Sequence, residues 1–415
     1  MQAHAQRLAQ SLTLPCGAVL PNRLAKSAMS EAMATMDNRV TPELINLYDA
    51  WAKGGIGLSI TGNIMVDRRA LGEPGNVVIE DDRDLVQLKQ WAEAGRRHNS
   101  ATWVQLNHPG KQSPRGLNKQ NLSPSAVPFN PDMRAFFDTP KAMTEEDIQD
   151  VIARFGRAAG IVKAAGFDGV QIHGAHGYLV SQFLSPKHNI RTDDWGGSPQ
   201  KRRRFVLAVY EAMRAAVGSA FPIGIKLNSA DFQRGGFTEE ESLATIAALS
   251  AAGIDMIEIS GGTYEAPAMA GLRQKESSKA REAYFLEFAE KVRQQVSTPL
   301  MVTGGFRSLS GMGDALASGA MDLVGLARPL AIEPDAPKRL LAGVETRYRV
   351  KQLSTGIKPI DRMGLLEVVW YTRQLRRIGR GKLPKPNESA LLAMLGYVSG
   401  NVRGTLRTRR LRASA

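Results

Sequence analysis

The chain has 415 residues, of which 43% are hydrophobic, and this suffices for one large core or one large domain with an appendage. Its single cysteine, Cys16, excludes disulfides, cysteine-ligated zinc and iron–sulfur clusters, and it fits a reducing compartment. The net charge of +14 is uneven: residues 338–415 carry 18 Lys and Arg against 4 Asp and Glu, and residues 1–337 are neutral. The high overall charge therefore does not indicate a nucleic-acid-binding domain.

The first residues lack the continuous apolar stretch of a signal peptide. No stretch approaches the roughly 20 apolar residues that span a bilayer. These features predict a soluble, cytoplasmic protein.

Eight short runs of apolar and β-branched residues recur along the chain, each ending in small or polar residues. They are Leu24–Ser30, Gly57–Val66, Ala101–His108, Gly169–Ala175, Pro222–Ala230, Met256–Gly262, Pro299–Gly305 and Leu323–Leu330. Segments with helical spacing lie between most of them, and Thr144 and Thr238 each precede acidic residues in the pattern of a helix N-cap. Strand alternating with helix eight times predicts an α/β fold, a (β/α)₈ TIM barrel over residues 1–344.

Two segments depart from this alternation. Residues 109–143 form a long insertion rich in Pro, Asn and Ser, which is suited to a lid. Residues 345–415 form a basic, mostly helical C-terminal extension with a predicted helix at Leu365–Gly379 and a second apolar run at Ala390–Val398. An arginine-rich segment, RGTLRTRRLR, ends the extension at residues 403–412.

A loop with three polar rings follows the fourth strand. It carries His173, His176 and Tyr178, and an Arg191–Ser198 run (RTDDWGGS) comes shortly after. Donors crowded at the end of a strand are what a site at the mouth of a β/α barrel needs. The H-x-x-H-G-Y and R-x-D-D-W-G-G-S motifs resemble the Old Yellow Enzyme family of FMN-dependent NADH:flavin oxidoreductases and ene-reductases.

The resemblance, which covers residues from about 12 to about 340, implies roles for these rings. His173 and His176 would anchor the carbonyl oxygen of an activated alkene, and Tyr178 would donate a proton. The residues alone leave other interpretations open. His-x-x-His with an acidic ligand could bind zinc or iron for hydrolysis, although the sequence offers no obvious third ligand. The two histidines could also simply pack in the loop. The run at Arg191 is interpreted as a scaffold.

Glycines and an arginine after the seventh and eighth strands indicate a phosphate site. Gly304, Gly305 and Phe306 follow the seventh strand, and Ala327 and Arg328 lie in the eighth. Backbone N–H groups near glycine and an arginine fork both suit a phosphate. The resemblance implies that this phosphate is that of FMN. Ala327 stands where the family has a glycine. The methyl group of alanine is tolerable there if the backbone φ is negative.

Polar residues in the other strands suit a flavin ring. The resemblance assigns Ala28, Met29 and Ser30 to the strand 1 stretch beside the flavin, with Gly62 also at the cofactor. Gln105 matches the glutamine that reads the pyrimidine edge, and Lys226 the cation near N1. A buried lysine needs a partner. Flavin is the favoured one, and a local carboxylate such as Asp231 is the alternative. Asp231 and Arg234 are interpreted as structural.

The expected protein is an enzyme that takes hydride from NADH or NADPH and reduces an alkene next to a carbonyl or nitro group. Alternatives are a flavin-dependent amine or methyl-group dehydrogenase, a metal-dependent hydrolase or aldolase, and a catalytically idle membrane-docked barrel. The basic extension could pack on the barrel, contact a membrane surface or an acidic partner, or reach a second subunit. The sequence does not name the natural substrate, the preferred nicotinamide cofactor or the subunit number.

Overall fold

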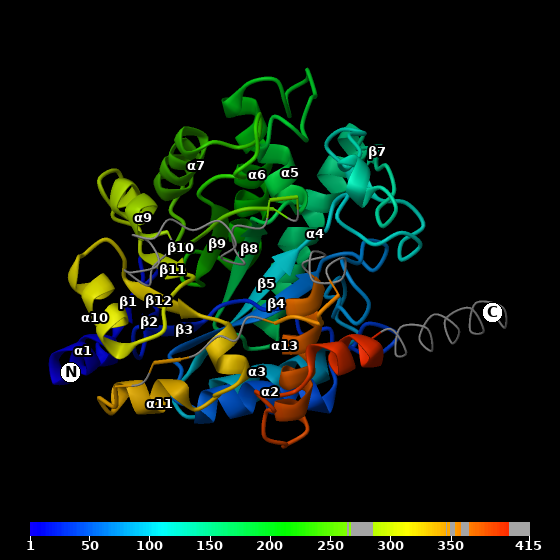
Figure 1. Ribbon diagram of the computed structural model, residues 1–415. Coiled ribbons are helices and arrows are strands. Elements are labelled where there is room, and N and C mark those ends of the chain that lie inside the picture. The colour runs from blue at the N-terminus through cyan, green and yellow to red at the C-terminus, as the bar shows by residue number, and fades with distance from the viewer. Residues whose placement is uncertain (264, 267–284, 346, 349–352, 358–364, 398–415) are drawn as a thin grey trace.

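A computed structural model of the protein describes residues 1–263, 265–266, 285–345, 347–348, 353–357 and 365–397. Eight parallel strands close into a barrel with helices around it (Figure 1), so the predicted TIM barrel is confirmed. In order around the barrel the strands are β3 (Leu24–Lys26), β4 (Leu58–Met65), β5 (Ala101–Asn107), β8 (Gly169–Gly174), β9 (Ile223–Asn228), β10 (Met256–Ser260), β11 (Leu300–Thr303) and β12 (Leu323–Leu326). Each lies within one of the eight predicted runs.

Helices follow the strands as the alternation predicts. Among the described residues they are α1 (Gln2–Ala9), α2 (Pro42–Lys53), α3 (Leu85–Arg96), α4 (Glu145–Ala164), α5 (Leu179–Leu184), α6 (Pro199–Val217), α7 (Glu239–Ala251), α9 (Leu286–Arg293), α10 (Leu309–Ala317), η3 (Arg328–Ala331), α11 (Ala336–Leu341) and α13 (Leu365–Gly379). Thr144 and Thr238 cap α4 and α7 through capping boxes with Asp147 and Glu241, as their sequence pattern predicts.

A short hairpin covers the end of the barrel at which the strands begin. It consists of β1 (Leu12–Thr13) and β2 (Val19–Leu20), which pair antiparallel. Leu12 and Leu20 pack with inward-facing apolar side chains such as Trp103 and Met256. This end of the barrel interior is therefore an apolar core.

Glycines make room for the largest of these side chains. A Cβ on Gly169 would lie 2.6 Å from the Trp103 indole, and one on Gly224 would lie 2.9 Å from it. The residues that follow at every second position, Gln171 and Lys226, also point inward because side chains alternate along a strand. The interior therefore changes from apolar to polar along the strands.

The 109–143 insertion has structure of its own, with β6 (Leu122–Ser123) paired to β7 (Lys141–Ala142) and a 3₁₀ turn, η1 (Pro131–Met133). The Lys111 ammonium ties it together, donating to the carbonyl of Val127 at 3.2 Å and lying 3.1 Å from His188 Nδ1. The insertion is thus linked to the segment that follows the three-ring loop.

Helix α13 coincides with the helix predicted at Leu365–Gly379, and it packs against α2 and η3. Residues 390–397 are helical, within the predicted second apolar run. The arginine-rich segment 403–412 lies outside the described residues. No helix in the described part of the chain combines the length and apolar character that crossing a membrane requires.

Candidate active site

Polar side chains fill one half of the barrel interior, because every second residue of adjacent strands points inward and is polar there. On β9 and β10, register pairs Lys226 with Glu258 and Asn228 with Ser260. On β8, Gln171 and His173 occupy the corresponding inward positions, because His173 pairs with Lys226 in register. Two polar layers therefore lie above the apolar core, at the ends of the strands where barrel enzymes place their sites.

The structure brings the three rings of the predicted catalytic loop together. The His173 ring centroid lies 5.2 Å from that of His176 and 4.7 Å from that of Tyr178, in edge-on arrangements. His176 adopts a left-handed backbone (φ 61°), which is held by a 3.2 Å hydrogen bond from its N–H to Asn228 Oδ1. The Tyr178 hydroxyl accepts a hydrogen bond from Asn63 Nδ2 at 3.4 Å.

Both histidines are held in the neutral form. Burial, followed by the nearby charge of Lys226, lowers the pKa of His176 to about 3. Burial also lowers the pKa of His173 well below its usual value, with further contributions from His176 and Lys226. The ring Nδ1 of His173 accepts the N–H of Ala175 at 3.4 Å, which leaves Nε2 as its donor.

Lys226 has an anionic neighbour that the sequence analysis did not name. Its Nζ lies 3.0 Å from Glu258 Oε1 and donates to Ser27 Oγ at 2.9 Å. Gln171 Nε2 donates to the other Glu258 oxygen at 2.8 Å, and Gln105 Nε2 donates to Gln171 Oε1 at 2.8 Å. Gln105 and Lys226 thus belong to one buried network.

The alternative partner of Lys226, Asp231, is engaged elsewhere. It accepts hydrogen bonds from Ser185 Oγ at 2.7 Å and from the N–H of Phe237 at 3.0 Å. The Arg191 guanidinium pairs with Asp193 and donates to the carbonyl of Met143 at 2.6 Å. These contacts tie loops together, as the structural interpretation of Asp231 and the scaffold interpretation of Arg191 predict.

The loops after β11 and β12 have the backbone shape of an anion site. Gly304 and Gly305 have φ of 122° and 98°, which favours glycine, and Phe306 beside them is buried. Ala327 has a φ of −129°, and because this φ is negative, the backbone tolerates the methyl group in place of glycine. The Arg328 Nη1 lies 3.1 Å from Glu367 Oε2 on α13, a neighbour absent from the sequence analysis.

The end of β3 packs closely on β4 at Gly62. A Cβ there would lie 2.4 Å from the carbonyl oxygen of Met29, and the Gly62 N–H donates to the Glu31 carboxylate at 3.1 Å. The register of β4 with β5 shifts beside Gly62. The Ser30 hydroxyl donates to Glu73, and burial raises the pKa of that carboxyl group. Close packing therefore fixes the strand 1 stretch.

Comparison with known families decides the identity of the barrel. The model of the NADH:flavin oxidoreductase / NADH oxidase family matches residues 15–347. The chain belongs to this family. As an FMN-dependent NAD(P)H:flavin oxidoreductase, the protein is an enzyme, and the fold and cofactor that the resemblance implied are confirmed.

Two curated flavin oxidoreductases and one solved structure illustrate the relationship. The chain is 39% identical over 368 residues to NADH-dependent flavin oxidoreductase iccE of Talaromyces variabilis, covering 81% of this chain and 87% of that relative. It is 38% identical to iliE of Neonectria sp. (strain DH2), covering 81% of this chain but only 47% of that longer relative. The Old Yellow Enzyme homologue from Zymomonas mobilis shares the fold with a TM-score of 0.70 at 23% identity, covering 82% of this chain and 94% of that one.

The polar layers of this flavin oxidoreductase fit FMN. Both side-chain polar atoms of Asn107 are buried without a hydrogen-bond partner, two residues beyond Gln105 on β5. A buried amide with both ends unsatisfied is costly unless a ligand or water meets it. Gln105 and Lys226 offer donors for a ring, whereas Gly305 and Arg328 suit a phosphate. The chemistry that FMN needs from its protein is therefore present.

Several polar residues of this flavin oxidoreductase escaped the sequence analysis. They are Ser27, Asn63, Asn107, Gln171, Glu258, Ser260 and Glu367. The strands GVQIH, IGIKLN and MIEIS all place a polar residue at alternate positions, and that period would have identified Gln171, Glu258 and Ser260. Glu367 gave no such signal because it lies on a helix outside the barrel.

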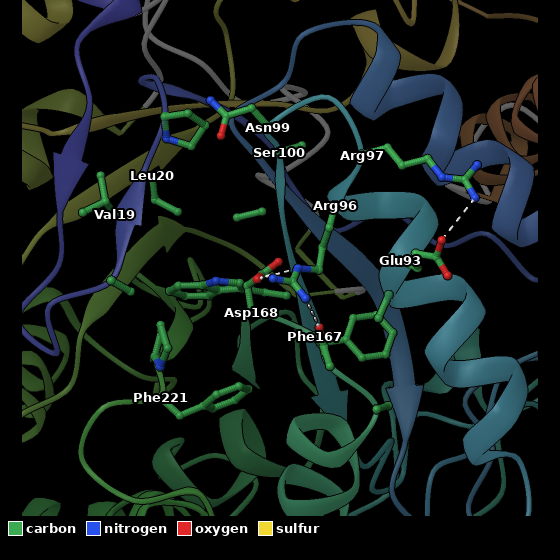
Figure 2. A pocket seen from close by; sticks show the side chains of 18 of the residues that line it. Val19, Leu20, Glu93, Arg96, Arg97, Asn99, Ser100, Phe167, Asp168 and Phe221 are labelled. Atoms are coloured by element: carbon green, nitrogen blue, oxygen red, sulfur yellow. Dashed lines mark hydrogen bonds and ion pairs between the residues drawn. The ribbon is translucent and has the colours of Figure 1, made fainter.

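Two other features of the flavin oxidoreductase lie outside this chemistry. Among the described residues, no group of three or more His, Cys, Asp and Glu side chains is placed to hold a metal ion. A cavity of about 870 Å³ opens at the opposite end of the barrel, where Figure 2 shows Arg96 pointing to Asp168. The Arg96 Nε lies 2.9 Å from Asp168 Oδ1. This cavity is distant from the strand ends that carry the catalytic loop, so it is not the active site.

Proposed function

We propose that this flavin oxidoreductase reduces the C=C bond of an α,β-unsaturated carbonyl or nitro compound, with NADH or NADPH as the hydride donor. The observation that carries the proposal is the grouping of His173, His176 and Tyr178 at the polar mouth of the barrel. Two neutral imidazoles and a phenol supply hydrogen-bond donors and a proton without requiring a charged acid.

The two imidazoles would hold the substrate oxygen. His173 has its Nε2–H available as a donor because Nδ1 accepts from Ala175. His176 Nε2 lies 2.7 Å from Ser260 Oγ, and if the hydroxyl donates there, Nδ1–H is the remaining donor. Two donors on one oxygen stabilise the negative charge that develops when the alkene accepts a hydride.

Tyr178 would complete the reaction with a proton. FMN held in the barrel would supply, for Cβ of the alkene, a hydride taken from NAD(P)H. The phenol then gives its proton to Cα and regains one from solvent, so the alkene gains one hydride and one proton. The side-chain amide of Asn63, whose Nδ2 lies 3.4 Å from the Tyr178 oxygen, would stabilise the phenolate while it exists.

The test is anaerobic reduction of the flavin by NADPH or NADH, followed by addition of 2-cyclohexenone. The flavin absorbance should bleach with the nicotinamide and return when the enone is added. If NAD(P)H reduced the flavin but only oxygen, and not the enone, reoxidised it, the proposal of alkene reduction would be wrong. The family membership would not be affected.

Tyr178→Phe separates the two half-reactions. Bleaching by NADPH should persist at a similar rate, whereas reoxidation by cyclohexenone should slow by about 10²-fold or more, as expected for loss of a general acid. Tyr210→Phe is the matched control, because Tyr210 is a buried tyrosine on α6, outside the loop that carries His173, His176 and Tyr178. Equal reoxidation by wild type and Tyr178→Phe would remove Tyr178 as the acid.

A further inference from the structure

The helix at residues 390–397 has large apolar residues on its exposed side as well as on its buried side. It buries Ala390, Ala393 and Met394, at 7%, 1% and 8% exposure. It exposes Leu392 and Leu395 at 60% and 57%, and Leu391 at 37%. At 100° per residue these three leucines lie within one arc of the helix, opposite the buried side. We call Leu391, Leu392 and Leu395 the leucine face.

Contacts with α13 fix the direction in which the leucine face points. Glu388, just before the helix, accepts Arg373 Nε at 2.8 Å and Gln374 Nε2 at 2.9 Å, and its carbonyl accepts Trp370 Nε1 at 3.1 Å. The N–H of Lys385 donates to Gln374 Oε1 at 2.7 Å. The segment is therefore anchored at several points, and the leucines are not exposed through fraying.

The chain that leads into this helix is rich in positive charge. Residues 373–385 contain six Lys and Arg and no Asp or Glu, and Arg380, Lys382 and Lys385 are exposed. A Cβ on Gly396 would lie 2.9 Å from Arg373 Nη1, so one of these cations lies directly beside the helix. After Glu388 the sequence contains five arginines and no acidic residue. The sequence on both sides of the leucine face is thus strongly basic.

We propose that the leucine face and its flanking cations dock on an anionic lipid surface. Clustered exposed leucines mark an interaction site, and lipid offers an apolar layer directly beneath anionic headgroups. Each Lys or Arg near such a surface adds attraction. A second copy of this chain would bring the same positive charge to the contact and be repelled. An acidic protein would need a matching apolar hollow beside its carboxylates.

The test is co-sedimentation of the FMN-loaded full-length protein with sucrose-filled vesicles. Vesicles of phosphatidylcholine with phosphatidylserine at 7:3 should bind the protein, vesicles of pure phosphatidylcholine should bind it at least tenfold more weakly, and 0.5 M NaCl should release it. The Leu392→Gln/Leu395→Gln variant should lose at least tenfold in affinity. The control is Val19→Gln, since Val19 on β2 is 57% exposed and lies outside the extension.

NADH oxidation by each variant verifies folding and should be unchanged, because these residues lie outside the active site. The proposal is overturned if wild type ignores anionic vesicles, or if the leucine variant binds them as wild type does. Binding to poly-glutamate without binding to vesicles would assign the surface to an acidic protein. An oligomer in sedimentation velocity that the leucine variant dissociates, without vesicle binding, would assign it to a second copy. Either result also overturns the lipid proposal.

Discussion

Glu258 lies opposite Lys226 on the neighbouring strand, with 3.0 Å between Oε1 and Nζ, and its side chain is fully buried. The pair forms the charged centre of an otherwise uncharged network beneath the catalytic loop. Because both charges are removed from water, each depends on the other more than a surface pair would. The cation that the resemblance assigns to flavin N1 therefore has a charge that is already partly balanced.

Removing one member of this pair should be more harmful than removing both. Glu258→Met or Lys226→Met alone should lower the free energy of unfolding by about 3–5 kcal/mol, because the remaining charge is buried without its partner. The double variant should recover most of that loss. Urea unfolding of the four proteins measures the coupling, and additive losses would show that the pair does not act as a unit.

The partly buried His176 should make the protein acid-sensitive. Its folded pKa is about 3 against about 6.5 when unfolded, so the unfolded state binds the proton first as the pH falls. The stability is complete above pH 6.5 and is lost progressively from 6.5 towards 3. Between pH 7 and pH 5, wild type should lose about 2 kcal/mol more than His176→Gln. If the unfolding free energies of wild type and His176→Gln fell by the same amount between pH 7 and pH 5, this prediction would be wrong.

Ser260 should act on substrate binding through His176. Ser260→Ala removes the 2.7 Å contact to His176 Nε2 and frees the imidazole to rotate or change tautomer. A phenol that binds at the histidine pair should then bind about fivefold more weakly, the equivalent of about 1 kcal/mol for one hydrogen bond. Titration of the flavin absorbance with phenol measures this. Ser260→Thr keeps the hydroxyl and should restore most of the affinity.

Glu367 should limit the affinity for FMN. Its carboxylate occupies the Arg328 guanidinium and would lie near the phosphate that Arg328 is predicted to hold. Glu367→Gln should therefore tighten FMN binding by roughly two- to fivefold, a small effect because both side chains are partly exposed. Isothermal titration of the apoprotein with FMN measures the change. Weaker binding would mean that Glu367 orients Arg328 instead of competing with the phosphate.

Gly62 should be intolerant of any side chain. In Gly62→Ala the Cβ would lie 2.4 Å from the Met29 carbonyl oxygen, so the strand 1 stretch must move. We expect loss of bound FMN on purification and a free energy of unfolding lower by at least about 1 kcal/mol. Gly160→Ala on α4 is the control, since its Cβ would meet only the Ala216 methyl group at 3.9 Å. That variant should be as stable as wild type or slightly more so.

The strand–helix alternation was sufficient to predict the barrel, because each strand is a short apolar run bounded by turn residues. The caps at Thr144 and Thr238 were equally readable, since a capping box is a local interaction. His173, His176 and Tyr178 could be proposed as a group because they lie within six residues of one another at one strand end. Local patterns therefore identified the elements and the most concentrated part of the site.

Contacts between distant segments could not be predicted in the same way. The pairing of Lys226 with Glu258 depends on the register of two strands. The sequence shows that polar residues alternate in each strand, but not which residue of one strand lies opposite which residue of the other. The contact of Arg328 with Glu367 depends on where α13 packs, and no local pattern states that. The exposure of three leucines at residues 390–397 likewise depends on how this helix packs against the rest of the protein. It could not be predicted from the usual preference of leucine for the interior.

The proposed reaction takes one hydrogen from an acid that exchanges with solvent and the other from the carbon-bound hydrogen of NADH. Reduction of 2-cyclohexenone in D₂O with unlabelled NADH tests both at once, at an enone concentration high enough to reoxidise the flavin before its own N–H exchanges. NMR of the product should show one deuterium at Cα and none at Cβ. Deuterium at Cβ, or no saturated product from a protein whose flavin NADH reduces, would contradict the proposed reaction.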